Sequence, residues 1–435
     1  MRNLQITSFK HKLKLLALTS VMAVMSATST AQEKLAITGA QIHTMGPKGI
    51  IVEGTLLIED GKIKDVLSNN TVPAGFTKVD ASGKVITPGF MGALTSLGLV
   101  EVGLSAGVND SRVDAHPVSS VGAAYDSQFA FNADSTLLDV TRIEGFTSAA
   151  TGLRTSQLFD GQGAIISLGD ELESVTHPQA FVHVDVGNGG ADNNGESRAA
   201  LWVALNQSLE EAVFALSYDL SPSEGWEGMI SRADAKALIP VVQGDTPLLV
   251  TAHRANDILQ VLALKKRFAN LDVVLVHASD GWRVASQIAE ADVPVILNPE
   301  FNLPGEFDRL GATLENAGRL HEAGVMIAIG VDTHNVRLAA QHAGNAVANG
   351  LPHDAAIASL TINPAKIFGV DDNIGSLESG KQADFVIFSG DPLEVTQAAE
   401  QVYVSGKAVS MESRQTKLRD RYLKYTGEKP VGYIK

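Results

Sequence analysis

The sequence of 435 residues contains no cysteine. This absence excludes disulfide bonds, thiolate metal sites, a cysteine nucleophile and a lipid attached to cysteine. Basic residues are outnumbered, 34 against 49 acidic ones, which gives a formal net charge of −15. A chain with this charge is not expected to bind nucleic acid or an anionic membrane surface. After the first 31 residues, no apolar run is long enough to form a membrane helix.

The first 31 residues have the pattern of a signal peptide. Four cations near the start are followed by the apolar run Leu15–Ala27, which is short for a membrane span, and then by small residues at Ser29–Ala31. We therefore predict a cleaved leader at residues 1–31 and a soluble periplasmic or secreted protein. Removal of the four cations would change the formal charge from −15 to −19.

The remaining sequence predicts β-rich ends around an α/β centre. Short strands are predicted near the N-terminus at Leu35–Thr38, Ile51–Ile58 and Ile63–Leu67, and near the C-terminus at residues 401–409. Between these ends, apolar strands alternate with helical stretches, which is typical of a parallel α/β architecture. The clearest strands are residues 180–186, 247–252, 272–276, 293–297 and 325–331. An open doubly wound sheet would also alternate, but it would need a glycine-rich phosphate loop after its first strand, and none stands in that context.

Several motifs resemble the amidohydrolase superfamily, especially its secreted, imidazolonepropionase-related members. They are Pro88-Gly-Phe90 after an apolar strand, Gly375-x-Leu-x-x-Gly-Lys-x-Ala-Asp384, and Thr361-x-Asn-Pro-Ala-Lys366. The resemblance implies a (β/α)8 TIM-like barrel at residues 87–369. The barrel would be inserted in a small β-sandwich made from both chain ends, residues 32–86 and 370–412. Residues 413–435 would form a charged tail that begins as a helix.

The chain departs from the family pattern at the first barrel strand. The superfamily carries Asp-x-His-x-His there, and its two histidines hold a metal, whereas this chain has Gly92, Leu94 and Ser96 at the corresponding positions. The fourth strand of binuclear members supplies a lysine that bridges two metals, and residues 180–186 contain none. We therefore expect a divergent member without the first-strand His-x-His and with one metal rather than two.

Two histidines end consecutive predicted strands. His253 follows residues 247–252, and His277 follows residues 272–276. The active sites of barrels are built at the carboxyl ends of the strands, so both imidazoles are expected at the mouth. The resemblance implies that they bind a divalent metal, for which zinc is the expected ion. Either histidine could instead be satisfied by ordinary hydrogen bonds near a strand end.

Asp332 follows the predicted eighth strand, residues 325–331. The resemblance implies that Asp332 is the catalytic base that activates water, and the neighbouring His334 is a second catalytic candidate. Asp332 could also cap the helix expected near Asn335, because aspartate is favoured at that position. The two roles are compatible.

His183 and Asp185 share one face of residues 180–186, and valines occupy the other face. Because the apolar face should meet the surrounding helices, these two side chains are expected to point into the barrel. We predict that His183 and Asp185 partly replace the missing metal ligands. They could equally be a buried polar pair that fills a layer of the barrel.

Three further residues are predicted to bind substrate. Arg254 and Arg337 lie beside the expected centre in sequence, and guanidinium groups suit a substrate carboxylate. A surface ion pair is the alternative for each arginine. Asn298 follows the seventh strand and is expected to line the pocket.

Together these features predict a metal-dependent hydrolase of carbon–nitrogen bonds in a small amide, cyclic amide or dipeptide-like substrate. The second hypothesis is an inactive amidohydrolase-fold protein of the periplasm that binds a ligand without hydrolysing it. A metal-free hydrolase that uses Asp332 and His334 ranks last, because no nucleophile triad accompanies them. The expected partner is a small molecule, and the sequence leaves open whether the chain forms a homo-oligomer.

Overall fold

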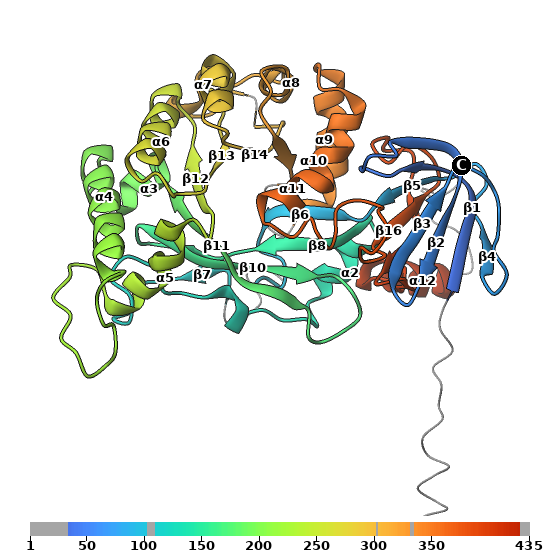
Figure 1. Cartoon of the computed structure of the whole chain (residues 1–435), viewed down its shortest axis with the longest axis horizontal. Coiled ribbons are helices and arrows are strands. Elements are labelled where there is room, and N and C mark those ends of the chain that lie inside the picture. The colour runs from blue at the N-terminus through green and yellow to red at the C-terminus, as the bar shows by residue number, and fades with distance from the viewer. Residues whose placement is uncertain (1–33, 102–108, 302, 331–334, 427–435) are drawn as a thin grey trace, which may run out of the picture.

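The structure is a computed structural model that describes residues 34–101, 109–301, 303–330 and 335–426. Both chain ends contribute to one eight-stranded sheet, in the order β18-β17-β16-β5-β1-β2-β3, with β4 paired to β1. Its strands are β1 (Lys34–His43), β2 (Ile50–Glu59), β3 (Lys62–Leu67), β4 (Thr77–Asp80), β5 (Val85–Pro88), β16 (Phe385–Phe388), β17 (Ala399–Val404) and β18 (Lys407–Ala408). Figure 1 shows the blue strands from the N-terminal end and the red strands from the C-terminal end side by side.

This terminal sheet forms because its strands bury large apolar side chains in one cluster. Ile37, Leu56 and Ile86 come from the N-terminal strands, and Phe385 comes from the C-terminal ones. The join is the antiparallel pairing of β5 with β16, in which Val85 lies opposite Phe388. The three strands expected near the N-terminus are therefore confirmed; β1 continues five residues beyond the predicted Leu35–Thr38, whereas β2 and β3 nearly match the predicted bounds.

A second eight-stranded sheet forms the barrel that the sequence predicts. It follows the order β15-β14-β13-β12-β11-β10-β8-β6. Its strands are β6 (Phe90–Thr95), β8 (Phe146–Thr151), β10 (Phe159–Ser167), β11 (Val175–Asp185), β12 (Leu248–Ala252), β13 (Val273–His277), β14 (Val295–Leu297) and β15 (Ile327–Ile329). The two edges meet where the amides of Ala93 and Leu94 donate to the carbonyl of Gly330, at 3.0 and 3.1 Å.

The barrel departs from a purely parallel arrangement at β10. This strand runs antiparallel to both of its neighbours, β8 and β11. The connection from β8 to β10 spans only residues 152–158, which is too short for the crossover that a parallel neighbour requires. That connection contains β9 (Arg154–Thr155), which pairs with β7 (Arg112–Val113) in a separate two-stranded sheet.

Helices cover the outside of the barrel (Figure 1). The α-helices are α2 (Thr136–Arg142), α3 (Asn188–Asn193), α4 (Arg198–Ala215), α5 (Arg232–Gln243), α6 (Ala255–Arg267), α7 (Ala285–Glu290), α8 (Asn316–Glu322), α9 (Ala339–Ala348), α10 (His353–Leu360), α11 (Ile362–Ile367) and α12 (Arg414–Thr426). Short 3-10 turns are η1 (Ser127–Phe129), η2 (Gly281–Val284), η3 (Phe307–Arg309) and η4 (Val336–Leu338). No helix in the part of the chain that the structure describes is both long and apolar enough to cross a membrane.

The alternation of side chains along β11 separates two cores. Val182 and Val184 belong to the cluster between the strands and the helices. Phe181 belongs to the cluster inside the barrel, together with Leu249 and Val274. Residues of β11 that share the face of Phe181 therefore point inward, which confirms the orientation predicted for His183.

Candidate active site

Two imidazoles stack at the carboxyl ends of neighbouring strands. His253 directly follows β12, and His277 is the last residue of β13. The parallel register places Ala252 opposite His277. The two ring centroids are therefore only 5.2 Å apart, with 19° between the ring planes. The structure thus brings together the two histidines that the sequence predicts at the barrel mouth.

An unusual backbone turn holds this pair. His277 and Ala278 have φ angles of 69° and 43°, in the left-handed region that residues other than glycine rarely adopt. The turn is fixed by hydrogen bonds from the amide of Ala278 to the carbonyl of Ala252 (3.0 Å) and from the amide of Asp280 to the carbonyl of His253 (2.9 Å). Backbone strain of this kind persists where the surrounding structure over-determines it, often at functional sites.

Both imidazoles are held in the neutral form. Burial lowers the pKa of His253 to about 4, and the positive charge of Arg309 acts in the same direction. Burial, followed by the charges of His253 and Arg309, lowers the pKa of His277 well below its ordinary value. His253 Nδ1 lies 2.9 Å from Ser279 Oγ. The buried Nδ1 of His277 has no hydrogen-bond partner among the described residues. When His253 Nδ1 donates to the Ser279 hydroxyl, the lone pair of His253 Nε2 is left for a ligand, and a neutral His277 likewise has one nitrogen lone pair.

His183 lies in a hydrogen-bonded chain inside the barrel. Its Nδ1 is 2.8 Å from Asp160 Oδ2, and its Nε2 is 2.9 Å from Thr251 Oγ1. An ionised carboxylate only accepts, so Nδ1 donates to Asp160, and Nε2 shares a hydrogen bond with the Thr251 hydroxyl. Sequence reasoning missed Asp160, because its place beside His183 follows from the antiparallel pairing of β10 with β11.

Asp185 is also occupied by protein hydrogen bonds. Its two carboxylate oxygens accept from the amides of Gly187 (2.7 Å) and Gly190 (3.1 Å). Burial raises the pKa of Asp185. The metal-binding role of His183 and Asp185 therefore stays a prediction, and either residue would have to exchange a present partner to fill it.

The structure places two of the predicted substrate-binding residues in local contacts. Arg254 forms a two-pronged ion pair with Asp257, through Nε at 2.8 Å and Nη2 at 2.6 Å. That arrangement is the ion pair named as the alternative in the sequence analysis. Asn298 is buried, and its Oδ1 accepts from the amide of Glu300 at 2.9 Å.

Arg337 is half-buried on η4, near enough to Glu144 for its charge to act on that carboxyl. Its charge opposes the burial that raises the pKa of the Glu144 carboxyl. The roles of Arg254, Arg337 and Asn298 toward substrate remain predictions. Asp332 and His334, the two catalytic candidates, lie outside the described residues.

The first barrel strand offers no metal ligand. A Cβ at Gly92 would lie 2.8 Å from Thr95 Cγ2 and 3.2 Å from Ala149 Cβ, so packing leaves no room for a longer side chain. Leu94 packs against the cluster inside the barrel. Among the residues that the structure describes, no three histidine, aspartate or glutamate side chains are grouped so that they could hold a metal ion. The described residues that fit a metal are thus the two neutral imidazoles, His253 and His277.

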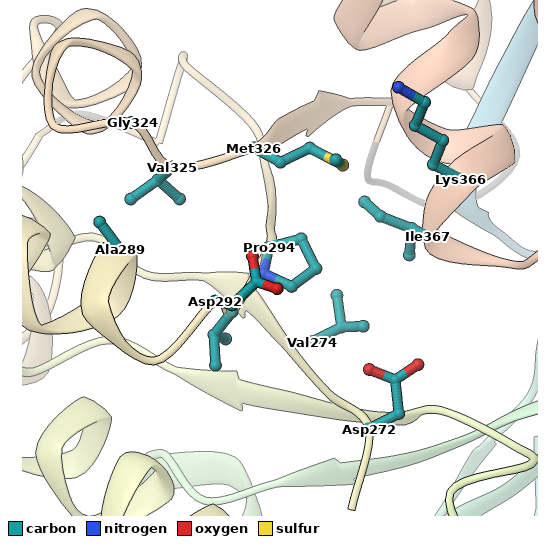
Figure 2. Close-up of a pocket in the computed structure, with 11 residues that line it drawn as sticks. Asp272, Val274, Ala289, Asp292, Pro294, Gly324, Val325, Met326, Lys366 and Ile367 are labelled. Atoms are coloured by element: carbon teal, nitrogen blue, oxygen red, sulfur yellow. The ribbon is translucent and has the colours of Figure 1, made fainter.

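A pocket at the opposite end of the barrel does not belong to this site. It is lined by Asp272, Asp292 and Pro294, which precede or begin β13 and β14, and by Lys366 from α11 (Figure 2). Conserved chemistry in barrel enzymes is built at the carboxyl ends of the strands rather than at this end. Lys366 therefore lies away from the imidazole pair.

Comparisons with known proteins agree with this architecture. The Amidohydrolase family model matches residues 252–409. An imidazolonepropionase from Symbiobacterium thermophilum is 25% identical over 383 residues, which cover 79% of this chain and 86% of the relative. An amidohydrolase structure from Thermotoga maritima MSB8 is 25% identical, with a TM-score of 0.77, and the match covers 87% of this chain and all of that one.

A more distant structure shares the fold. It is a Xaa-Pro dipeptidase with bound methionine in the active site, 16% identical with a TM-score of 0.55, matched over 87% of this chain and all of that one. The chain is thus similar to amidohydrolases over most of its length, in the barrel as well as in the sheet formed by the chain ends.

Proposed function

We propose that this protein hydrolyses a carbon–nitrogen bond in a small amide, cyclic amide or dipeptide-like substrate. The observation that carries the proposal is the stacked pair of neutral imidazoles, His253 and His277, at adjacent strand ends. The resemblance to an imidazolonepropionase and to a dipeptidase supports the same reaction class.

One divalent metal, zinc, would be held by His253 and His277 in this proposal. The hydrogen bond between His253 Nδ1 and Ser279 is the kind of support that orients a metal-binding imidazole. A zinc site needs about three protein ligands. Asp332, His183 and Asp185 remain the proposed sources of the third. When bound, the metal would polarise the carbonyl of the substrate and lower the pKa of water.

Asp332 is proposed as the base that takes a proton from the attacking water and returns it to the leaving nitrogen. His334 is proposed to assist in this proton transfer. Asp160 and Thr251 fix the ring orientation of His183, the proposed additional ligand, inside the barrel. The proposed substrate is a small molecule, and the proposed location is the periplasm or the medium, after cleavage of residues 1–31.

A second candidate function is ligand binding without hydrolysis. The tight packing around Gly92 favours it, because the first strand cannot supply the usual ligands. This alternative keeps the barrel and the ligand-binding mouth, but it requires neither bound metal nor turnover.

The experiment that tests the proposal compares metal content and turnover in the same preparations. Wild-type protein, a His253→Ala/His277→Ala double variant and a His321→Ala control would be loaded with zinc, desalted and analysed for metal per chain. His321 is an exposed histidine on α8, so its loss should change nothing. We expect about one zinc per chain in wild type and control, little in the double variant, and hydrolysis of N-acyl amino acids or dipeptides that follows the metal.

Two results would overturn the proposal. Wild-type protein without metal after zinc or manganese loading would favour the binding protein. Equal zinc in the double variant would reject His253 and His277 as ligands, even if the protein hydrolyses an amide.

A further inference from the structure

A cleft opens at the barrel mouth beside the imidazole pair. Its volume is about 330 Å³. Its wall includes Arg112 from β7, Arg154 from β9, Asp160 from the start of β10, and Asp185 at the end of β11. The same Asp160 is hydrogen-bonded to His183 inside the barrel, so one residue of the cleft wall contacts the polar interior of the mouth.

The cleft presents two arginines at directly paired positions. In the parallel register of β7 with β9, Arg112 lies opposite Arg154, so both side chains leave the same face of this two-stranded sheet. Like charges directly opposite each other across strands are destabilising. An anion that bridges the two guanidinium groups would reverse the sign of this interaction, because each group presents a planar fork of N–H donors.

Within the described part of the chain, the arginine pair is poorly neutralised. Arg154 forms no ion pair with a described residue. The acidic partner of Arg112 is Asp114, with 3.9 Å between Arg112 Nε and Asp114 Oδ1, and both side chains are mostly exposed. Exposed pairs of this kind contribute little.

The carboxylates that line the cleft already have other partners. Asp160 accepts from the Thr155 amide at 2.7 Å and from His183. Asp185 accepts from the amides of Gly187 and Gly190. These bonds direct both carboxylates toward groups other than the arginines. Arg112 and Arg154 therefore keep their capacity to bind an anion.

The cleft also lies close to the imidazole pair. Asp185 lines the cleft, and a Cβ built at Gly187 would lie 3.0 Å from Asp185 Oδ1 and 3.5 Å from His253 Cδ2. We therefore expect a ligand held by the arginine pair to extend from the cleft toward His253.

We propose that Arg112 and Arg154 together bind the free carboxylate of the substrate. The substrate class is then an amide that carries a carboxylate, such as an N-acyl amino acid or a dipeptide. This inference rests on the proposed function and deepens it, and it assigns the carboxylate to a pair of residues different from Arg254 and Arg337. Arg254 is paired with Asp257, whereas the cleft arginines are available.

Equilibrium binding tests this assignment without requiring turnover. The probes are a panel of N-acetyl amino acids, the corresponding N-acetyl amino acid amides, and inorganic phosphate, followed by ligand-observed NMR. The proteins are wild type, Arg154→Gln, Arg112→Gln and an Arg414→Gln control, where Arg414 is an exposed residue at the start of α12. Unchanged melting temperatures would show that the variants fold.

We expect wild type and the control to bind the acids about 10-fold or more tightly than the amides, as a charge-assisted pair of hydrogen bonds predicts. Either cleft variant should weaken binding of the acids and leave binding of the amides unchanged. The assignment would be overturned by equal binding of acids and amides to wild type, by no binding of any acid, or by an acid preference that survives Arg154→Gln. Phosphate that displaces the acids at equal or lower concentration would also overturn it, in favour of a phosphate site. Selective binding of acids by a protein that hydrolyses none of them would support the arginine pair and reject only the proposed hydrolysis.

Discussion

The burial of His253 makes a quantitative prediction about stability and pH. The folded protein binds a proton at His253 only near pH 4, whereas the unfolded chain binds it near the ordinary pKa of 6.5. The unfolded state therefore holds more protons between these two values. The contribution of His253 to stability is complete above pH 6.5 and is lost as the pH falls toward 4.

Proton linkage for these two pKa values gives about 2 kcal/mol of stability lost between pH 8 and pH 5 in metal-free protein. His277 acts in the same direction, because its pKa is also lowered by burial. Asp384 acts in the opposite direction, because burial raises its pKa to about 6. The pH dependence of the free energy of unfolding thus contains contributions from several groups. A variant is needed to isolate the contribution of His253.

The assay is urea unfolding in the presence of EDTA at pH 8 and pH 5. His253→Gln keeps a polar side chain beside Ser279 but removes the titrating group. We expect the loss of unfolding free energy between the two pH values to be about 2 kcal/mol smaller in this variant than in wild type. His321→Gln, which changes an exposed histidine, should behave as wild type. If wild type and His253→Gln lose the same free energy, the burial argument is wrong.

Three further changes test packing and polar contacts. Gly92→Ala should lower the free energy of unfolding by about 1–3 kcal/mol in urea titrations, because the new methyl group would meet Thr95 Cγ2 at 2.8 Å. An unchanged unfolding midpoint would show that this end of the strand is loosely packed. Phe181→Ala should lower the free energy of unfolding by about 3–5 kcal/mol in the same assay, because the ring is buried inside the barrel and its centroid lies 5.5 Å from that of Phe368. A loss below about 1 kcal/mol would contradict the packing of Phe181 in this core. Asp234→Ala should cost about 3 kcal/mol or more, since the buried carboxylate accepts from the Ser119 hydroxyl at 2.6 Å and the Ala124 amide at 2.9 Å. Hydrogen exchange should then rise in residues 118–125, and protection equal to wild type would refute the role of Asp234.

Several barrel strands could be predicted because their apolar patterns are local. Residues 247–252 and 272–276 read as buried strands, and each is followed by a histidine, so the imidazole pair was predictable once a barrel was assumed. The inward orientation of the His183 side chain was also predictable, because side chains alternate between the two faces of a strand.

Other features depend on pairings that no local pattern reveals. The direction of β10 sets Asp160 beside His183, and the pairing of β7 with β9 sets Arg112 beside Arg154. In contrast, the ion pair of Arg254 with Asp257 has a local signal, since residues three apart meet on a helix. That spacing could have directed the search for a carboxylate-binding arginine away from Arg254.

The pairing of β5 with β16 has a consequence for biogenesis. These strands are separated by roughly 300 residues of chain, and β16 supplies the partner of β5 in the terminal sheet. During synthesis, the edge of β5 stays open until almost the whole polypeptide has been made, and such edges invite pairing with other chains. A truncation before Phe385 is therefore expected to yield aggregated material rather than a smaller folded barrel.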